Sequence, residues 1–331
     1  MTPLAQAPLA PTALAAPILV LGAPRSGTTW LAKIVDSHPG VVYRHEPDKA
    51  HPPPVPLTEA AVPALVARWA ASRTPSVVTK RPFFAKSWQP AWLRLSHTAL
   101  VGALDIAARL PMLPLPAQVP DLATAPAERV LFKSIALRHG AGALGRALPD
   151  SRIVFVLRHP CGQVSSVMRG NRQRRFDLQT EGTDMPFDEA AAMAHAATFG
   201  VASDAFQALP DAAKYAWGWR HFNETAYADL ASLPNVHILP YEALCADPVT
   251  VARAVMTFTG LGWVPETADF VSRSTAHTGD AGYYAVYRNA IAAAEAWRRR
   301  MDKADIEAVR RVASGSPLAR FWPDLVETAV A

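Results

Sequence analysis

The chain has 331 residues, of which 50% are hydrophobic, with a formal charge of +5 and an isoelectric point near 9.4. This length and apolar content suffice for one large α/β domain or two smaller ones, and the mild basic charge fits anionic small molecules, nucleic acid or acidic membranes equally well. With only Cys161 and Cys245, the composition excludes a disulfide scaffold and a cysteine-based zinc site, and it favours a reducing, cytoplasmic environment.

The first sixteen residues are rich in alanine, proline and leucine. They lack a positively charged start, and their prolines interrupt any apolar core, so they do not resemble a signal peptide. We expect a mobile tail over 1–16 and, because no repeat or linker divides the remainder, a single domain over 17–331. No apolar run is long enough for a membrane span.

An apolar run over 17–21 ends at Gly22 and leads through a loop into the apolar spacing of a helix, which predicts strand, tight loop and helix. Gly27 permits close backbone approach, and the Thr28 and Thr29 hydroxyls, the helix N–H groups and Arg25 face one point. This arrangement suits a phosphate or sulfate, although Gly-Thr-Thr is also a common helix cap. The loop is not a Walker A motif, because Thr28 stands where that motif has lysine.

The next segments are predicted in order. Residues 41–47 form a strand whose end carries Glu46, close to the first loop, because ligands of open α/β sheets lie at strand ends. Further expectations are a proline-rich spacer over 52–56, a helix over 58–72, a short strand over 77–80, a helix over 88–110 with Trp88, Trp92 and Leu95 on one buried face, and an irregular loop over 111–126 at the mouth of a site.

Two later strands end in cations. The run 129–134 includes Lys133, and the β-branched and aromatic run 151–157 leads to Arg158, after which Pro160 favours a helix start. Ser166 lies two turns into that helix, so it can share a ligand with Arg158 only if the helix passes beside that ligand.

The rest of the chain alternates between helices and one strand. We predict a polar loop over 169–185, helices over 187–209 and 211–231, a strand over 236–242, a helix from 247 to 260, a loop over 279–287 and a helix over 289–312. The fold class is therefore α/β, with a parallel sheet of about five strands and helices on both faces.

The predicted strand ends argue against a metal-dependent phosphotransferase. They carry Lys133, Arg158 and Tyr241, whereas a magnesium-dependent kinase needs an acidic residue there. Histidines show no paired spacing with cysteine or glutamate, which disfavours zinc. The sequence predicts a cation-rich anion site and no metal.

The stretch Pro24-Arg25-Ser26-Gly27-Thr28-Thr29-Trp30, together with Arg158-His159-Pro160 and Ser166, resembles the two signatures of the sulfotransferases that use 3′-phosphoadenosine 5′-phosphosulfate (PAPS). The resemblance implies a single P-loop-like domain, PAPS as the cofactor with adenosine 3′,5′-bisphosphate as its product, and a small hydroxylated acceptor in place of nucleic acid.

The resemblance also implies roles for individual residues. The resemblance implies that Arg25, Ser26, Gly27, Thr28 and Thr29 bind the 5′-phosphosulfate and that Trp30 contacts the adenine. It implies that Arg158 and Ser166 bind the 3′-phosphate, because a guanidinium fork and a hydroxyl suit a phosphate. A basic C-terminal loop closes the cofactor in this family, and its counterpart here is 283–288 with Arg288, without the family's Arg-Lys-Gly form.

The chain departs from the cytosolic branch of the family in two places. Arg25 stands where many members have lysine, and Ile135 stands where they have the histidine base. The chain is similar instead to the carbohydrate, tyrosyl-protein and bacterial branches, in which an acidic residue after the second strand is the base. That position is Glu46, with His45, His51 and Asp48 as reserve candidates, and Arg25 and Lys133 would stabilise charge.

Three functions remain open at this point. The first is sulfuryl transfer to a hydroxyl of a small metabolite or lipid, by in-line displacement with a carboxylate base. The second is a kinase-like phosphotransferase using ATP and magnesium, and the third is a non-catalytic nucleotide-binding module. Glu46 has a structural alternative too, as a strand-end carboxylate paired with Arg44 or Lys49.

Overall fold

The structure is a computed structural model that describes residues 14, 16–107, 116–120, 129–137, 139–172, 187–276 and 290–330. Three predictions fall on other residues. Most of the expected tail over 1–16, most of the expected loop over 111–126, and the basic loop with Arg288 therefore lie outside the described part of the chain.

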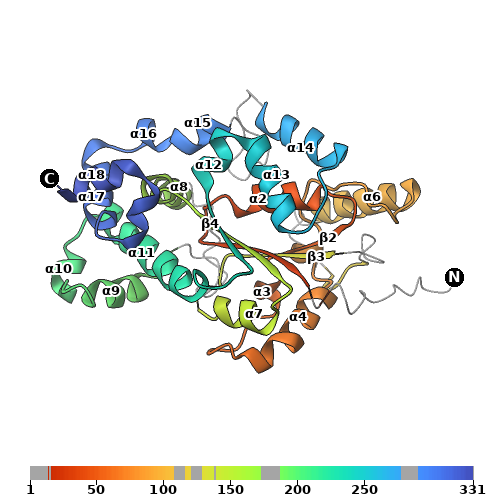
Figure 1. Cartoon of the computed structure of the whole chain (residues 1–331), viewed down its shortest axis with the longest axis horizontal. Helices are drawn as coiled ribbons and strands as arrows, with labels where there is room; N and C mark the ends of the chain where they lie inside the picture. Colours follow the sequence, from red (N-terminus) through yellow and green to blue (C-terminus); the bar gives the residue numbers. More distant parts are fainter. Residues whose placement is uncertain are drawn as a thin grey trace.

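A five-stranded parallel sheet forms the centre of the molecule, in the order β2-β3-β1-β4-β5 (Figure 1). The strands are β1 (Ile18–Gly22), β2 (Val41–His45), β3 (Arg129–Ser134), β4 (Arg152–Leu157) and β5 (Val236–Pro240). β1 and β4 are apolar over nearly their whole length because helices cover both of their faces. The predicted α/β class, with about five strands, is confirmed.

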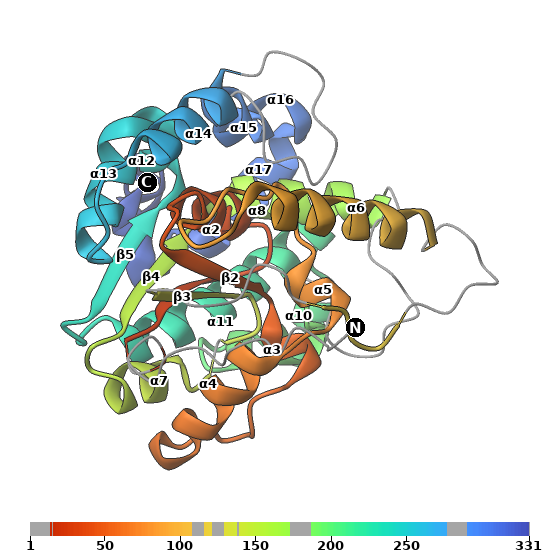
Figure 2. The same ribbon diagram turned by 90° about the vertical axis from the view of Figure 1, so that its right-hand side faces the viewer.

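Helices lie above and below this sheet (Figure 2). One face packs against α2 (Thr28–Asp36), α12 (Tyr241–Ala246), α13 (Pro248–Phe258), α14 (Pro265–Thr275) and α15 (Ala290–Glu295). The other face packs against α4 (Val62–Ala71), α7 (Ala141–Ala147), α11 (Asp211–Leu230) and α18 (Pro323–Val330). Both layers bury apolar side chains, so each face of the sheet has its own core.

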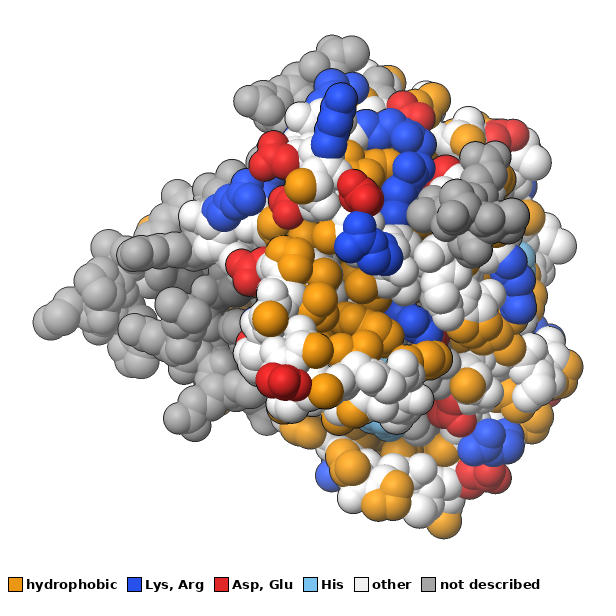
Figure 3. All heavy atoms as spheres, turned by 90° about the vertical axis from the view of Figure 1, so that its left-hand side faces the viewer, with side chains coloured by type: hydrophobic (Ala, Val, Ile, Leu, Met, Phe, Trp, Pro, Cys, Tyr) orange, Lys and Arg blue, Asp and Glu red, His pale blue; other side chains and the backbone are white. Residues whose placement is uncertain are grey.

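The remaining elements connect these layers or flank them. They are α3 (Pro47–Ala50), η1 (Glu59–Ala61), α5 (Pro75–Val78), α6 (Ala91–Ala107), α8 (Pro160–Arg172), α9 (Glu189–Ala197), α10 (Ser203–Gln207), α16 (Trp297–Arg300), α17 (Lys303–Ala313) and η2 (Pro317–Phe321). On the face drawn in Figure 3, which is the left-hand side of Figure 1, hydrophobic side chains form a connected area with Lys and Arg side chains near its upper border. Among the described residues, no helix combines the length and hydrophobicity that a membrane crossing requires.

Two predictions between 75 and 107 are wrong. Residues 77–80 do not form a strand, because Pro75 starts a helical turn, α5, whose Val77 and Val78 are buried against Val119. On α6, Trp92 and Leu95 are 59% and 67% exposed. The helix buries the opposite side, which carries His97 and Val101, so its tryptophan is not a core residue.

Three further boundaries differ from the predictions. The helix expected over 187–209 is divided into α9 and α10, with Gly200 at a left-handed φ of 81° between them. The helix expected over 289–312 is divided into α15, α16 and α17. Helix α8 continues to Arg172, into the segment predicted as a polar loop.

A buried charge cluster attaches the segment after α5 to helix α2. The Lys33 ammonium donates to Asp36 Oδ2 at 2.8 Å and to the Lys80 and Pro82 carbonyl oxygens at 2.7 and 3.0 Å. Lys86 donates to the other carboxylate oxygen of Asp36 at 2.9 Å. Burial lowers the pKa of Lys33 to about 8, although Asp36 opposes this shift. One carboxylate thus compensates two buried lysines.

Replacing Asp36 by asparagine should destabilise the fold by about 3–5 kcal/mol, because it leaves two buried ammonium groups without a counter-charge. Urea unfolding measures the effect. The matched control is Asp269→Asn, which removes an exposed pair with Arg273 and should change the free energy of unfolding by at most about 1 kcal/mol. Equal effects of the two substitutions would show that the cluster does not hold the segment in place.

Candidate functional site

The loop after β1 is shaped by two glycines. Gly27 precedes helix α2 with φ at 99°, and a Cβ placed there would lie 2.3 Å from a ring carbon of Tyr241. A Cβ at Gly22 would lie 2.7 Å from the Val156 carbonyl oxygen. The loop therefore packs tightly against β4 and α12. It contains a turn in which the Ser26 N–H donates to the Ala23 carbonyl oxygen at 3.1 Å.

Arg25 joins the two predicted signatures. Its Nε donates to Ser166 Oγ at 3.1 Å, and its carbonyl oxygen accepts a hydrogen bond from Arg158 at 2.8 Å. Helix α8 passes directly beside Arg158, since a Cβ at Gly162 would lie 3.0 Å from the Arg158 Nε. Ser166 and Arg158 both contact Arg25, so the two predicted residues lie on the same side of the loop.

Arg158 is held in place on several sides. Besides its bond to Arg25, it donates to the Ala293 carbonyl oxygen of α15 at 3.2 Å, and its guanidinium lies over the Tyr241 ring at 4.9 Å. Two carbonyl oxygens and an aromatic face thus hold the Arg158 guanidinium in place beside the loop.

Two polar atoms of this region are buried without a hydrogen-bond partner among the described residues, Ser26 Oγ and Arg158 Nε. A buried hydroxyl or guanidinium N–H normally has a partner. An anionic group bound here could supply both partners, so the residues fit an anion such as a phosphate.

Trp30 on α2 is buried against α12 and α14, two helices that follow β5 in the sequence. Its indole N–H donates to Ser274 Oγ of α14 at 3.0 Å, and its ring meets Tyr241 edge to face at a centroid distance of 6.1 Å. Thr28 is buried and Thr29 is partly exposed at the start of α2. The residues predicted to bind the PAPS donor therefore lie in this loop, at the start of α2 or in contact with the loop. Arg288 is outside the described part of the chain.

The second group of the site lies at the ends of β2 and β3. The two strands pair with His45 opposite Lys133, and the next main-chain N–H, that of Glu46, donates to the Lys133 carbonyl oxygen at 2.8 Å. The Lys133 ammonium donates to Glu46 Oε1, and Lys49 contacts Oε2 at 2.8 Å. Glu46 therefore does pair with Lys49, as its structural alternative predicts, and it also accepts a hydrogen bond from the buried Lys133.

The charges around Glu46 decide its protonation. Burial alone would raise the pKa of this carboxyl, but Lys133 and Lys49 hold it well below its usual range. Burial lowers the pKa of His45 well below its ordinary value, and its Nδ1 lies 2.7 Å from the Tyr43 hydroxyl. Burial raises the pKa of Asp48, which accepts a hydrogen bond from Ser134 at 2.5 Å. Among these three side chains, Glu46 is the one whose charged form its surroundings favour.

The backbone conformations at Arg25 and Glu46 set them apart. They are the non-glycine residues with positive φ in the described part of the chain, at 70° and 46°. Left-handed φ is uncommon for residues with a side chain and tends to occur at functional sites, where the surrounding structure enforces it. Both residues are also candidate site residues from their sequence motifs.

Lys80 is a site residue that the sequence reasoning missed. Burial lowers its pKa, and the charges of Lys133, Glu46 and Arg25 also act on it, so it lies close to both groups of the site. Its carbonyl oxygen accepts from Lys33, which fixes the chain here. The sequence feature that indicates Lys80 is its position shortly after the apolar pair Val77-Val78, in a run for which the sequence predicts a strand.

In the described residues, no group of three or more His, Cys, Asp or Glu side chains is arranged to hold a metal ion. The arrangement that is present consists of cations around one carboxylate, next to a loop with orphaned donors. It can bind an anion and accept a proton beside it.

Comparisons with known proteins identify a family that matches most of the chain. A model of the family described as the sulfotransferase family matches residues 17–265. Mouse carbohydrate sulfotransferase 5 is 30% identical over 83 residues, which are 24% of this chain and 21% of that protein, so the match spans about a fifth of this relative's length.

Two solved structures show overall similarity at low identity. The sulfotransferase domain from the curacin biosynthetic pathway has 16% identity and a TM-score of 0.45, covering 93% of this chain and 97% of that one. Mouse sulfotransferase SULT7A1 complexed with PAP has 13% identity and a TM-score of 0.45, covering 95% of this chain and 89% of that one.

Gly27→Ala should weaken binding of adenosine 3′,5′-bisphosphate at least about tenfold, or about 1.4 kcal/mol, because the added methyl group collides with Tyr241 and opens the loop. Calorimetry measures the affinity, and a melting curve reports folding. Gly200→Ala is the matched control, since Gly200 also has positive φ but nothing within 4 Å of the added Cβ. Unchanged affinity in Gly27→Ala would contradict the assignment of this loop.

Proposed function

The chain belongs to the sulfotransferase family, and on that premise we propose that it transfers the sulfuryl group of PAPS to a hydroxyl of a small hydroxylated metabolite or lipid. The transfer is an in-line displacement with Glu46 as the base. The observation that supports it most is the ion pair of Glu46 with Lys133 at the strand ends, beside the Arg25 loop.

The donor would be held by Arg25, Ser26, Gly27, Thr28 and Thr29 at its 5′ end. Arg158 and Ser166 would hold its 3′-phosphate, with Trp30 near the adenine, and Arg288 remains a proposed contact of the closing loop. When bound, PAPS supplies an electrophilic sulfuryl group on a stable leaving group. The orphaned Ser26 Oγ and Arg158 Nε support this assignment, because each would gain a partner.

Glu46 takes the proton of the acceptor hydroxyl on a carboxylate oxygen. While it is paired with Lys133 this carboxylate is a weak base, because its pKa is far below the working pH. When the Lys133 ammonium turns to the anionic oxygens of the donor, Glu46 keeps Lys49 as its partner and becomes more basic. Lys133 thus serves as a counter-charge to Glu46 at rest and as a stabiliser of negative charge during transfer.

Arg25 completes the charge stabilisation. Its guanidinium stays protonated, so it supplies charge and hydrogen bonds and not a proton. Lys80 adds a further positive charge near Lys133 and Arg25. In this proposal several cations surround one carboxylate, which acts as the base.

Glu46→Gln should reduce turnover by about 10²–10⁴-fold while leaving the affinity for adenosine 3′,5′-bisphosphate unchanged, since the amide cannot take the proton. Turnover is measured with PAPS and a panel of phenols, long-chain alcohols and monosaccharides, and affinity by calorimetry without magnesium. Glu59→Gln is the control, because that exposed carboxylate pairs with Arg146.

Unchanged turnover in Glu46→Gln would exclude Glu46 as the base. A native protein that binds the bisphosphate but transfers sulfate to no member of the panel would instead indicate a non-catalytic module.

The pH dependence provides a second test. Because the pKa of Glu46 in the free protein is lowered, its carboxylate stays ionised as the pH falls, and kcat/KM should be flat from pH 8 to pH 5. In Lys133→Met, burial without the cation raises this pKa, so the residual kcat/KM should decline with acid within that range. Lys303→Met, an exposed substitution, should keep the native profile. A native acid limb between pH 6 and 7 would indicate a histidine base.

A further inference from the structure

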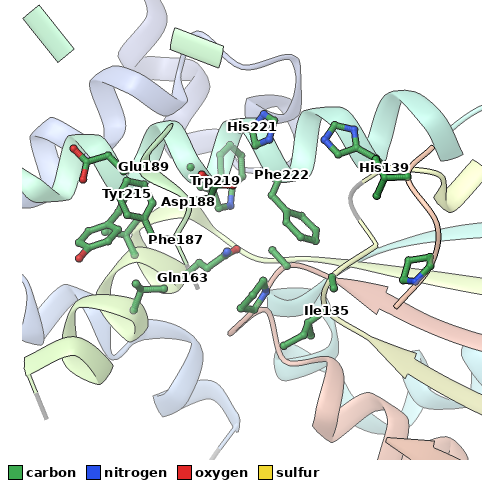
Figure 4. Close-up of a pocket in the computed structure, with 18 of the residues that line it drawn as sticks. Ile135, His139, Gln163, Phe187, Asp188, Glu189, Tyr215, Trp219, His221 and Phe222 are labelled. Carbon is green, nitrogen blue, oxygen red and sulfur yellow. The ribbon is translucent and has the colours of Figure 1, made fainter. Parts of the chain in front are cut away.

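A cavity of about 560 Å³ lies beside the donor loop, between helices α8 and α11 and the ends of β1 and β3 (Figure 4). Its walls are largely rings and prolines. The lining residues that matter here are Pro24, Ile135, Gln163, Phe187, Trp219 and Phe222.

The cavity adjoins the catalytic groups through the chain itself. Pro24 directly precedes Arg25, and Ile135 follows Lys133 by two residues. Gln163 stands three residues before Ser166 on α8, so the two lie on neighbouring turns of one helix. The cavity therefore borders the two segments that carry Arg25 and Lys133, and neither of these side chains is among its described lining residues.

One polar group in the wall is left without a partner. The side chain of Gln163 extends from α8 into the cavity, its residue is 5% exposed, and its amide oxygen has no hydrogen-bond partner among the described residues. A buried carbonyl oxygen that loses its bonds to water must find a donor elsewhere. A bound molecule with a hydroxyl or N–H group would supply that donor.

The described lining of the cavity lacks the positive charge of the donor site. Among the described lining residues there is no lysine or arginine, and Asp188 and Glu189 are present. These two carboxylates already have partners, since Asp188 caps helix α9 and Glu189 lies 3.6 Å from the Lys214 ammonium. An acidic acceptor would lose hydration here without gaining a counter-ion, whereas an uncharged or cationic one would not. Rings and prolines suit an apolar, ring-containing body.

We propose that this cavity holds the sulfuryl acceptor, that the acceptor is an uncharged or cationic phenol or alcohol with an apolar body, and that Gln163 selects it by accepting a hydrogen bond from a second donor group. This assignment rests on the proposed sulfotransferase function. It makes Gln163 a specificity residue and excludes acidic saccharides as preferred acceptors.

The charge selection is tested with native protein, PAPS and three phenols of similar size, namely 4-ethylphenol, tyramine and 3-(4-hydroxyphenyl)propanoate. The expected kcat/KM for the carboxylate is at least about tenfold below those of the neutral and cationic phenols. A carboxylate that is transferred as well as the others would overturn the charge assignment.

The role of Gln163 is tested with pairs of acceptors that differ by one donor group, such as 4-(2-hydroxyethyl)phenol and 4-ethylphenol, and the corresponding longer pairs. The native protein should prefer the two-donor member of at least one pair. Gln163→Leu should reduce that preference about tenfold through KM, with affinity for adenosine 3′,5′-bisphosphate unchanged. Gln207→Leu, the same substitution on exposed α10, should keep it.

A second variant keeps the test independent of the amide. Val167→Phe fills the cavity from the same helix and should raise KM for the longer acceptors more than for the shorter ones. If Gln163→Leu keeps the native preference, or Val167→Phe keeps the native KM values, the cavity is not the acceptor site. If no acceptor is sulfated by the native protein, the proposed function itself fails, which is a different result.

Discussion

The site depends on how positive charge at the carboxyl edge of the sheet is compensated. Lys133 is buried at the end of β3, with Lys80 and Arg25 close enough to act on the same charges. Glu46 balances this group through its contacts with Lys133 and Lys49. The compensation is local, and under the proposed function the sulfuryl oxygens of a bound donor would compete with Glu46 for Lys133.

The backbone conformations of Arg25 and Glu46 help to hold these charges in position. Arg25 and Glu46 have left-handed conformations, and each is fixed by neighbours: Arg25 by its bonds to Arg158 and Ser166, Glu46 by its N–H bond to the Lys133 carbonyl oxygen. Such conformations are unfavourable for residues with side chains and persist only where the fold imposes them. The two residues follow β1 and β2, which lie on either side of β3 in the sheet.

Donor and acceptor would meet under contrasting electrostatic conditions. The loop of Arg25 presents cations and orphaned donors, whereas the cavity beyond Pro24 and Ile135 is apolar and lacks lysine and arginine among its described lining residues. Ile135 stands where a histidine base would be in the cytosolic branch, so the wall there is apolar. Under the proposed function this contrast would disfavour entry of the anionic donor into the cavity, since burial of its charge there would be unfavourable.

The sequence by itself determined the sheet, the loop after β1 and the cation-ended strands, because buried parallel strands are continuous apolar runs and short motifs carry local geometry. It could not place Trp92, which has apolar neighbours at helical spacing but an exposed side chain, or Lys80, whose environment comes from Lys33 and Lys133. Only the tertiary structure decided that Arg25 contacts Ser166 and that Lys133 pairs with Glu46, because these partners are 141 and 87 residues apart and meet only through the order of the strands.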